Sequence, residues 1–314
     1  MIVTVTLNPS IDRTLRIADL QRGGVNRAEL VRVDAAGKGV NVSRALAAYG
    51  ADTHAVMVGA ELGSEWMSEQ LSAQGIAHSI VMAQGVTRSN LTLIEADGTM
   101  TKLNEPGVSM TPEILAAVEG ALDSLSLHNK TVVFAGRLNP GAAEDTYARL
   151  VQHAKSRGAR VVLDASGAPL AAAVRPNGPD LIKPNQHELG GLVGRELTTV
   201  ADAIDSAREV IAKGVGAVLC SLGKDGAIYV TPDEVVHVEP VHPVVGTPVG
   251  AGDILLAIFL AGGANVDALP SAVQWSAASV ALPGTAIPTH QQASAVEVVV
   301  HQNINMNREL VEVA

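Results

Sequence analysis

The feature that most constrains the fold is a regular alternation of short apolar runs with longer Ala- and Leu-rich segments. Apolar runs rich in Val, Ile and Leu lie at residues 2–7, 55–58, 131–134, 160–163, 180–182 and 217–220. Helix-like segments lie at residues 39–49, 65–74, 112–125, 142–157, 199–213, 252–260 and 271–282, several of them followed by Gly. Strands buried on both faces read as continuous apolar runs, so the alternation predicts an α/β fold with a central, mostly parallel sheet and helices on both faces.

Two stretches, at about residues 12–33 and 77–103, depart from this alternation. In "SNLTLIEADGTMTKL" polar and apolar residues alternate on either side of an "ADGT" turn at residues 96–99. That pattern predicts antiparallel strands with one solvated face. Neither a flexible linker nor an internal repeat divides the chain. We therefore expect one domain over residues 1–314, with a small β-sheet lid formed by the two stretches.

Composition narrows the functional class. A net charge of −10 and 2% aromatic residues argue against nucleic-acid binding, which needs basic surfaces and aromatic stacking platforms. Cys220 is the only cysteine, so no disulfide within the chain is possible, and a reducing cytoplasm is the expected location. The longest apolar run, residues 254–261, is far shorter than the ~20 residues of a membrane-crossing helix. We expect a buried helix there and no membrane association.

The segment "PVGAGD" at residues 248–253 places a glycine-rich turn and one carboxylate before that apolar run. A turn that opens a helix leaves backbone N–H groups free, and the helix dipole favours negative charge beside them. The amides of Gly250, Ala251 and Gly252 would then form an anion hole, and Asp253 would accept a proton from an attacking hydroxyl. The spacing is equally compatible with a second role, in which Asp253 only caps the first helical turn.

The segment "LIKPNQHEL" predicts a second polar group beside a helix start. If Pro184 precedes a helix, Asn185 and Glu188 share one face of its first turn, where they suit a hydrated Mg²⁺ near nucleotide phosphates. Lys183 adds a cation beside them. The same two residues also have the spacing of a capping box, which would need no metal.

Three further segments combine glycine with polar residues. "AAGKG" places Gly37 and Gly39 before a helix, either to admit a ligand close to the backbone or only to form a tight turn; it matches neither a Walker A loop nor the dinucleotide fingerprint. Asp12 follows the first strand and either accepts sugar hydroxyls or orders its own turn. In "SLGKDGAIYV", Ser221 and Gly223 either contact nucleotide phosphate or belong to a plain hairpin.

These segments, in this order, resemble the ribokinase-like carbohydrate kinases of the PfkB group over essentially the whole chain. The nearest branch is that of 1-phosphofructokinase and tagatose-6-phosphate kinase. The resemblance lies in "TLNPSID" at 6–12, "AAGKGVNV" at 35–42, "TRSN" at 87–90, "NEPG" at 104–107, "KPNQHEL" at 183–189, "SLGKDGA" at 221–227 and "VGAGD" at 249–253.

The resemblance implies a role for each of these groups. It implies that Asp253 is the catalytic base, with the anion hole at Gly250, Ala251 and Gly252. It places Asn185 and Glu188 around Mg²⁺, in contact through water. It assigns to the sugar site Asp12, Gly37, Lys38, Gly39, Asn41 and Arg88. It assigns to the ATP side Ser221, Gly223 and Gly226, to which we add Lys183 and Asn185. It also implies a homodimer formed through the lid.

One departure bears on the substrate. The branch usually has Gly-Ser-Leu-Pro where this chain has "GRLN" at residues 136–139, so Arg137 replaces a small hydroxyl residue that would face the sugar phosphate. A guanidinium there would tighten phosphate binding or shift the preferred substrate. The expected reaction is ATP-dependent phosphorylation of fructose 1-phosphate to fructose 1,6-bisphosphate. The alternatives are a tagatose-6-phosphate or fructose-6-phosphate kinase and a catalytically silent sugar-phosphate-binding regulator.

Overall fold

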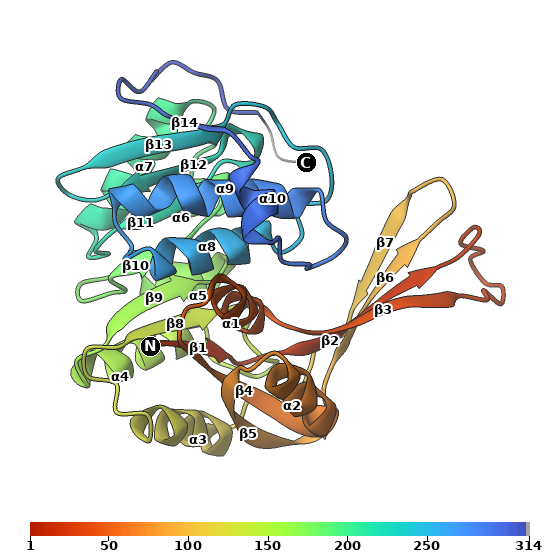
Figure 1. The fold of residues 1–314 in the computed structure, drawn as a ribbon. Coiled ribbons are helices and arrows are strands. Elements are labelled where there is room, and N and C mark those ends of the chain that lie inside the picture. The colour runs from red at the N-terminus through yellow and green to blue at the C-terminus, as the bar shows by residue number, and fades with distance from the viewer. Residues whose placement is uncertain (312–314) are drawn as a thin grey trace.

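A computed structural model describes residues 1–311 as one large and one small β-sheet with helices packed on the large one (Figure 1). In the large sheet the strand order is β14-β13-β12-β11-β10-β9-β8-β1-β4-β5, and in the small one β3-β2-β6-β7. The strands are β1 (Ile2–Thr6), β2 (Ser10–Arg16), β3 (Glu29–Ala36), β4 (Thr53–Leu62), β5 (Ala77–Val86), β6 (Ser89–Ile94), β7 (Met100–Asn104), β8 (Thr131–Ala135), β9 (Arg160–Asp164), β10 (Leu181–Ile182), β11 (Val218–Ser221), β12 (Ala227–Val230), β13 (Val235–Pro240) and β14 (Val298–Val300).

The helices connect the strands and cover both faces of the large sheet (Figure 1). They are α1 (Lys38–Tyr49), α2 (Ser64–Ala73), α3 (Pro112–Asp123), α4 (Thr146–Ser156), α5 (Gly167–Ala173), α6 (Gln186–Val193), α7 (Val200–Ala212), α8 (Ala251–Ala261), α9 (Leu269–Val280) and α10 (His290–Ser294). The strands from β5 to β11 in the sheet order pair in parallel, and β12 to β14 complete the sheet with antiparallel pairs. The predicted α/β fold with a mostly parallel sheet is confirmed.

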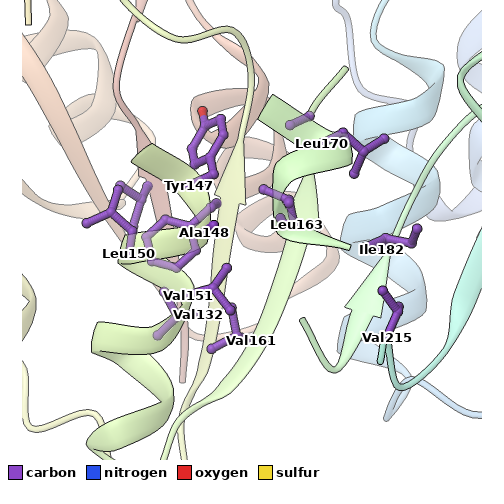
Figure 2. Packing of buried hydrophobic residues seen from close by; sticks show 14 of the residues in the cluster. Val132, Tyr147, Ala148, Leu150, Val151, Val161, Leu163, Leu170, Ile182 and Val215 are labelled. Atoms are coloured by element: carbon purple, nitrogen blue, oxygen red, sulfur yellow. The ribbon is translucent and has the colours of Figure 1, made fainter. Parts of the chain in front are cut away.

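Side-chain alternation along the strands divides the core into two main layers. On β1, Val3 and Val5 join the cluster formed with α3 to α7, whereas Thr4 turns to the other face and its Oγ1 lies 2.8 Å from Ser43 Oγ of α1. Figure 2 shows the first layer, where Tyr147 and Leu150 of α4 pack over β8 and β9. The second layer packs α1, α8, α9 and α10 on the opposite face. The large sheet therefore has packed side chains on both of its faces.

The apolar run that precedes Gly262 forms α8, as expected, and it is buried. Its residues from Ile254 to Leu260 are at most 7% exposed, and Cys220 on β11 is fully buried. Among the described residues, no helix is both long enough and apolar enough to cross a membrane.

The predicted limits of the lid were wrong in its second half. Residues 77–86 form β5, which pairs in parallel with β4 at the edge of the large sheet, so the small sheet takes residues 89–104 and not 77–103. In the second half of β5 one face is exposed, at Met82, Gln84 and Val86, so its residues alternate in the same way as those of a lid strand. Inside the small sheet, β2 pairs with β6 in parallel rather than antiparallel, while the turn between β6 and β7 forms as predicted.

The start of α4 also differs from the prediction. The helix was expected from residue 142 and begins at Thr146, because the amide of Ala142 bonds to the carbonyl of Asn139 in a turn. The Oγ1 of Thr146 bonds back to the carbonyl of Ala143 at 2.6 Å, at the point where the helix begins. The short helices α5 and α10 were not predicted, since neither is long enough to show a helical period.

Candidate active site

The parallel strands bring their carboxyl ends to one edge of the large sheet. Asn8 follows β1, Arg137 follows β8, Asp164 ends β9 and Lys183 follows β10. Ligand sites of open parallel sheets lie outside this edge, because the loops and the free helix starts meet there. A cavity of about 1370 Å³ opens at the same place, and its walls include Asp12, Lys38, Lys183, Ser221 and Asp253.

Asp253 lies in the first turn of α8 and faces this cavity. The helix starts after Gly250, which has a left-handed backbone (φ 80°), and no side chain of the described residues caps it. The Asp253 carboxylate, 6% exposed, instead accepts a hydrogen bond of 2.8 Å from Asn41 Nδ2 on α1. Burial, with a smaller contribution from the negative charge of Asp164, raises the pKa of Asp253 to about 6. In this structure Asp253 therefore does not serve as a helix cap.

The three amides expected to form an anion hole are not all free. The amide of Ala251 donates to the carbonyl of Pro248 at 3.1 Å, because the left-handed Gly250 turns the chain back on itself. Including Ala251 in the hole was therefore wrong. Within residues 1–311 no backbone acceptor meets the amides of Gly250 and Gly252. A β-carbon added to Gly252 would lie 3.3 Å from Lys183 Nζ, so the ammonium group of Lys183 lies beside Gly252.

A buried carboxylate that the sequence reasoning missed holds two lysines at the site. Asp164, fully buried, lies 2.8 Å from Lys38 Nζ and 3.3 Å from Lys183 Nζ. Burial acts to raise the pKa of Asp164, but the ammonium groups of Lys183 and Lys38 outweigh it and lower that pKa. Burial likewise acts to lower the pKa of Lys38, whereas the charges of Asp164 and Asp253 raise it. Asp164 and Lys38 therefore stay ionised together, and the Asp164 carboxylate holds the side chains of Lys38 and Lys183 in place.

Asn185 and Glu188 form a capping box at the start of α6. The Asn185 Oδ1 accepts from the amide of Glu188 at 2.8 Å, and the Glu188 Oε2 accepts from the amide of Asn185 at 2.9 Å. Both residues also line the cavity. The structural alternative weighed for this pair is therefore confirmed, and it leaves the second carboxylate oxygen of Glu188 outside the capping hydrogen bonds.

On the lid side, Asp12 of β2 belongs to a small hydrogen-bonded group. Its Oδ1 accepts from Ser10 Oγ at 2.7 Å and from Asn90 Nδ2 at 2.9 Å. Burial raises the pKa of Asp12, and these two hydrogen bonds partly oppose that effect. Asn90 lies opposite Asp12 in the β2–β6 pair, and its Oδ1 is buried with no partner among the described residues. Sequence reasoning did not single out Ser10 or Asn90; their positions in the "NPSID" and "TRSN" segments were the available signal.

Gly37 and Gly39 act through packing, whereas Lys38 and Asn41 reach the cavity. A β-carbon at Gly37 would lie 2.7 Å from Thr6 Cγ2, and one at Gly39 would lie 2.5 Å from Thr6 Oγ1. The described lining of the cavity includes Lys38 and Asn41 but neither glycine. Their assignment to the sugar site stays a prediction, and the packing of α1 on β1 leaves no room for a side chain at either position.

Arg88 and Arg137 lie near each other, outside the described lining of the cavity. Arg88 Nε donates to the carbonyl of Pro9 at 3.3 Å, and Arg137 is exposed after β8. Burial, and to a smaller extent the positive charge of Arg137, lower the pKa of Arg88, whereas Asp12 acts in the opposite direction. Both guanidinium groups thus lie on the Asp12 side of the site.

The residues expected on the ATP side line the other part of the cavity. Ser221 ends β11, and a 3₁₀ turn at Gly223–Asp225 leads through Gly226 into the antiparallel β12. Ser221, Gly223 and Gly226 all line the cavity. The hairpin reading is confirmed, and the hairpin lies at the cavity wall. Gly226 is required there, because a β-carbon would lie 2.0 Å from the Val238 carbonyl oxygen and its φ is +78°.

The chain is a carbohydrate kinase of the pfkB family, whose model matches residues 5–292. A relative named 1-phosphofructokinase from Xanthomonas campestris pv. campestris is 39% identical over 81% of each chain. Another of that name from Rhodobacter capsulatus is 37% identical over 82% of this chain and 81% of its own. Phosphofructokinase-2 from Escherichia coli in complex with fructose-6-phosphate has a TM-score of 0.83 at 28% identity, covering 94% of this chain and 97% of its own. An ATP-dependent sugar kinase activity follows from the family.

Proposed function

We propose that the protein transfers the terminal phosphoryl group of ATP to the 6-hydroxyl of fructose 1-phosphate, giving fructose 1,6-bisphosphate and ADP. The observation that carries the chemistry is a buried carboxylate, Asp253, beside the amides of Gly250 and Gly252, which have no backbone acceptor among the described residues. The relatives named 1-phosphofructokinase support this choice of sugar phosphate.

In this proposal Asp253 is the general base. A pKa of about 6 leaves most of the carboxylate ionised at neutral pH, and it is basic enough to take the hydroxyl proton as the new O–P bond forms. The hydrogen bond from Asn41 fixes one of its oxygens and leaves the other for the incoming hydroxyl. Positioning of this kind, more than covalent chemistry, is what phosphoryl transfer asks of a protein.

The start of α8 and Lys183 would stabilise the transferred group. Negative charge spreads over the phosphoryl oxygens as the bond to the ADP oxygen breaks. The amides of Gly250 and Gly252 and the positive end of the helix dipole favour that charge, and Lys183 adds a fixed ammonium group. Asp164 holds Lys183 and Lys38 in place, and the turn with Ser221, Gly223 and Gly226 forms the nucleotide side of the site.

The lid side would bind the sugar phosphate. Asp12 and the Oδ1 of Asn90, which has no partner within residues 1–311, are acceptors for sugar hydroxyl groups. Lys38, Arg88 and Arg137 supply positive charge for the 1-phosphate. These three residues concentrate cations on this side of an acidic protein.

Mg²⁺ fits the nucleotide side through water. Asn185 and Glu188 keep their capping hydrogen bonds, so they suit the hydration shell of the ion better than direct coordination, and hydrated Mg²⁺ usually keeps several of its waters. When bound with ATP, the ion would neutralise charge on the phosphates.

A second candidate is phosphorylation of fructose 6-phosphate, which is favoured by the similarity to a phosphofructokinase-2 solved with that sugar phosphate. A coupled assay of ADP release over fructose 1-phosphate, fructose 6-phosphate, tagatose 6-phosphate and unphosphorylated fructose separates the candidates. The expected result is a kcat/KM for fructose 1-phosphate at least about tenfold above the others. Faster turnover of fructose 6-phosphate or tagatose 6-phosphate would refute the choice of sugar phosphate. Binding of a sugar phosphate without any turnover would instead support the silent regulator.

We further propose a homodimer formed through the lid. No strand of the described chain pairs with the outer edges of β3 and β7 in the small sheet, and the sheet exposes apolar side chains, including Leu30 (56%), Met100 (46%) and Leu103 (52%). Free edges with apolar side chains favour pairing with a second copy. Light scattering on the wild type and on Leu103→Lys tests this, since the variant is expected to shift toward monomer. A monomeric wild type at micromolar concentration would contradict the proposed dimer.

The cytoplasmic location expected from the sequence stays a prediction.

A further inference from the structure

The 3₁₀ turn between β11 and β12 has two sides with different surroundings. Gly223, Lys224 and Gly226 line the main cavity, whereas the Asp225 side chain points away from it into a second cavity of about 430 Å³. Asp225 is 4% exposed, and its side chain is held from outside the hairpin. Asp225 therefore links the wall of the main cavity to the groups that bind its carboxylate on the far side of the turn.

Both oxygens of Asp225 are bound by the C-terminal segment, which we define as residues 301–311. Arg308 donates to Oδ1 at 2.8 Å, and the amide of Val311 donates to Oδ2 at 3.1 Å. The backbone carbonyl of Asp225 accepts from His237 Nε2 on β13 at 2.8 Å. A buried carboxylate is costly unless it is paired in this way, so the position of the turn depends on these contacts.

The guanidinium of Arg308 joins a second carboxylate to the first. It pairs with Glu239 of β13 as well as with Asp225, and Glu239 also lies 2.9 Å from His301 Nε2. The His301 ring stacks on that of His237 at 4.7 Å. His237, Glu239 and His301 lie close enough together to suggest a metal site. However, the Glu239 carboxylate already pairs with the Arg308 guanidinium, and the His237 Nε2 is hydrogen bonded to a carbonyl. Arg308 is thus the cation of this group.

The C-terminal segment is itself anchored to the body of the protein. The amide of Leu310 bonds to the carbonyl of Thr198 at 2.8 Å, and the carbonyl of Arg308 accepts from the amide of Val200 at 3.0 Å. Leu310 is 9% exposed and belongs to the main core cluster, and Val311 lines the main cavity. Arg308 therefore extends from an anchored backbone, and its guanidinium keeps the carboxylates of Asp225 and Glu239 in position.

We propose that the C-terminal segment is a strap that holds the 223–226 turn in the shape that binds nucleotide, and that Arg308 is a positioning residue for ATP. The segment lies against the part of the cavity assigned to the nucleotide and away from Asp12 and Arg88 on the sugar side. Loss of Arg308 would leave the buried carboxylate of Asp225 and the partly buried carboxylate of Glu239 without their cation, and the turn would move off its position. The proposal depends on the proposed function only in naming ATP as the ligand.

The test compares Arg308→Met with a matched control, Arg157→Met. Arg157 also pairs with an aspartate, Asp123, with one contact of 2.8 Å, but it lies between α4 and α3 and does not line either cavity. ADP binding is measured by titration calorimetry, and KM for ATP and for the sugar phosphate by steady-state kinetics. In Arg308→Met the dissociation constant of ADP and the KM of ATP are expected to rise about tenfold, with kcat and the sugar-phosphate KM within about twofold of wild type. Arg157→Met is expected to match the wild type.

The outcomes separate the strap from a merely structural role. An unchanged ADP dissociation constant in Arg308→Met would overturn the proposal, and so would equal losses for both substrates or an equal loss in Arg157→Met. Should Arg308→Met fail to fold, Asp225→Asn removes one charge with little change of shape, and unchanged ADP binding in that variant overturns the proposal as well. Wild type that binds ADP but phosphorylates no sugar phosphate contradicts the proposed function and leaves the strap to be judged by calorimetry.

Discussion

Asp253→Asn is the substitution that tests the proposed chemistry most directly, because it keeps the size of the side chain and removes its basicity. The Asn41 hydrogen bond of 2.8 Å can persist to an amide oxygen, so the site keeps its shape. General bases contribute about 10²- to 10⁴-fold to rate, so kcat at pH 7.5 is expected to fall by that factor while KM for both substrates changes little. The assay is coupled ADP release.

The pH profile of the wild type tests the same residue by a second route. With the pKa of Asp253 raised to about 6, the ionised, active form predominates above that pH and is lost as the pH falls through it. From the plateau above pH 7 to pH 5 the activity is expected to drop roughly tenfold, whereas a carboxylate with its ordinary pKa of 3.8 would stay ionised over that range. The acid limb is expected to be absent from the residual activity of Asp253→Asn.

Two further variants make this prediction sharper. Asn41→Ala removes a hydrogen bond that lowers the pKa of Asp253, so the acid limb is expected to move to higher pH. Asp180→Asn is the matched control, since Asp180 pairs with Lys155 at the amino ends of the parallel strands, away from the cavity. The pH profile of this variant is expected to match that of the wild type. If Asp253→Asn keeps its turnover within about tenfold of wild type, or if it retains the acid limb, the assignment of Asp253 as the base is wrong.

Three other predictions concern the metal, the sugar phosphate and the turn at the cavity. Glu188→Gln is expected to raise the Mg²⁺ concentration for half-maximal activity about tenfold, and an unchanged value would remove Glu188 from the metal site. Arg137→Ser is expected to raise the KM for the sugar phosphate about three- to tenfold, with a smaller effect at high salt; a KM that does not change places Arg137 outside the phosphate site. Gly226→Ala is expected to lower the free energy of unfolding by about 2–4 kcal/mol in a denaturant titration, because its β-carbon would lie 2.0 Å from a carbonyl oxygen. Its control is Gly98→Ala, which also has a positive φ (90°) but has open space around it, and equal losses in the two variants would contradict the steric argument.

Much of the large sheet could be predicted because its strands are buried on both faces. Runs such as residues 132–135 are apolar throughout, and that pattern has few other interpretations. β5 was misassigned for the converse reason: at the sheet edge one of its faces is exposed, and its sequence then matches that of a lid strand. Burial, which the pattern reports, does not specify which sheet a strand joins.

Within the site, single segments predicted chemistry but left its alternatives open. The two readings of Asn185 and Glu188 turn out to be compatible, because one pair of side chains both caps α6 and lines the cavity. For Asp253 they are exclusive, and contact with Asn41, 212 positions away in the sequence, decides against the cap. Asp164 had only one signal, a lone carboxylate at the end of an apolar run, and nothing local indicated that two lysines would meet it.

The sequence by itself determined the α/β class, the family and the identity of the helix starts that face the cavity, because apolar periodicity and glycine-rich turns are local properties of the chain. The tertiary structure alone decided which amides of the 250–252 turn stay free, which lysines Asp164 holds and how the C-terminal segment reaches Asp225. Those contacts join residues that are far apart in the chain, and charge and burial act through space, so only the folded arrangement sets the pKa of Asp253 and the shape of the nucleotide side.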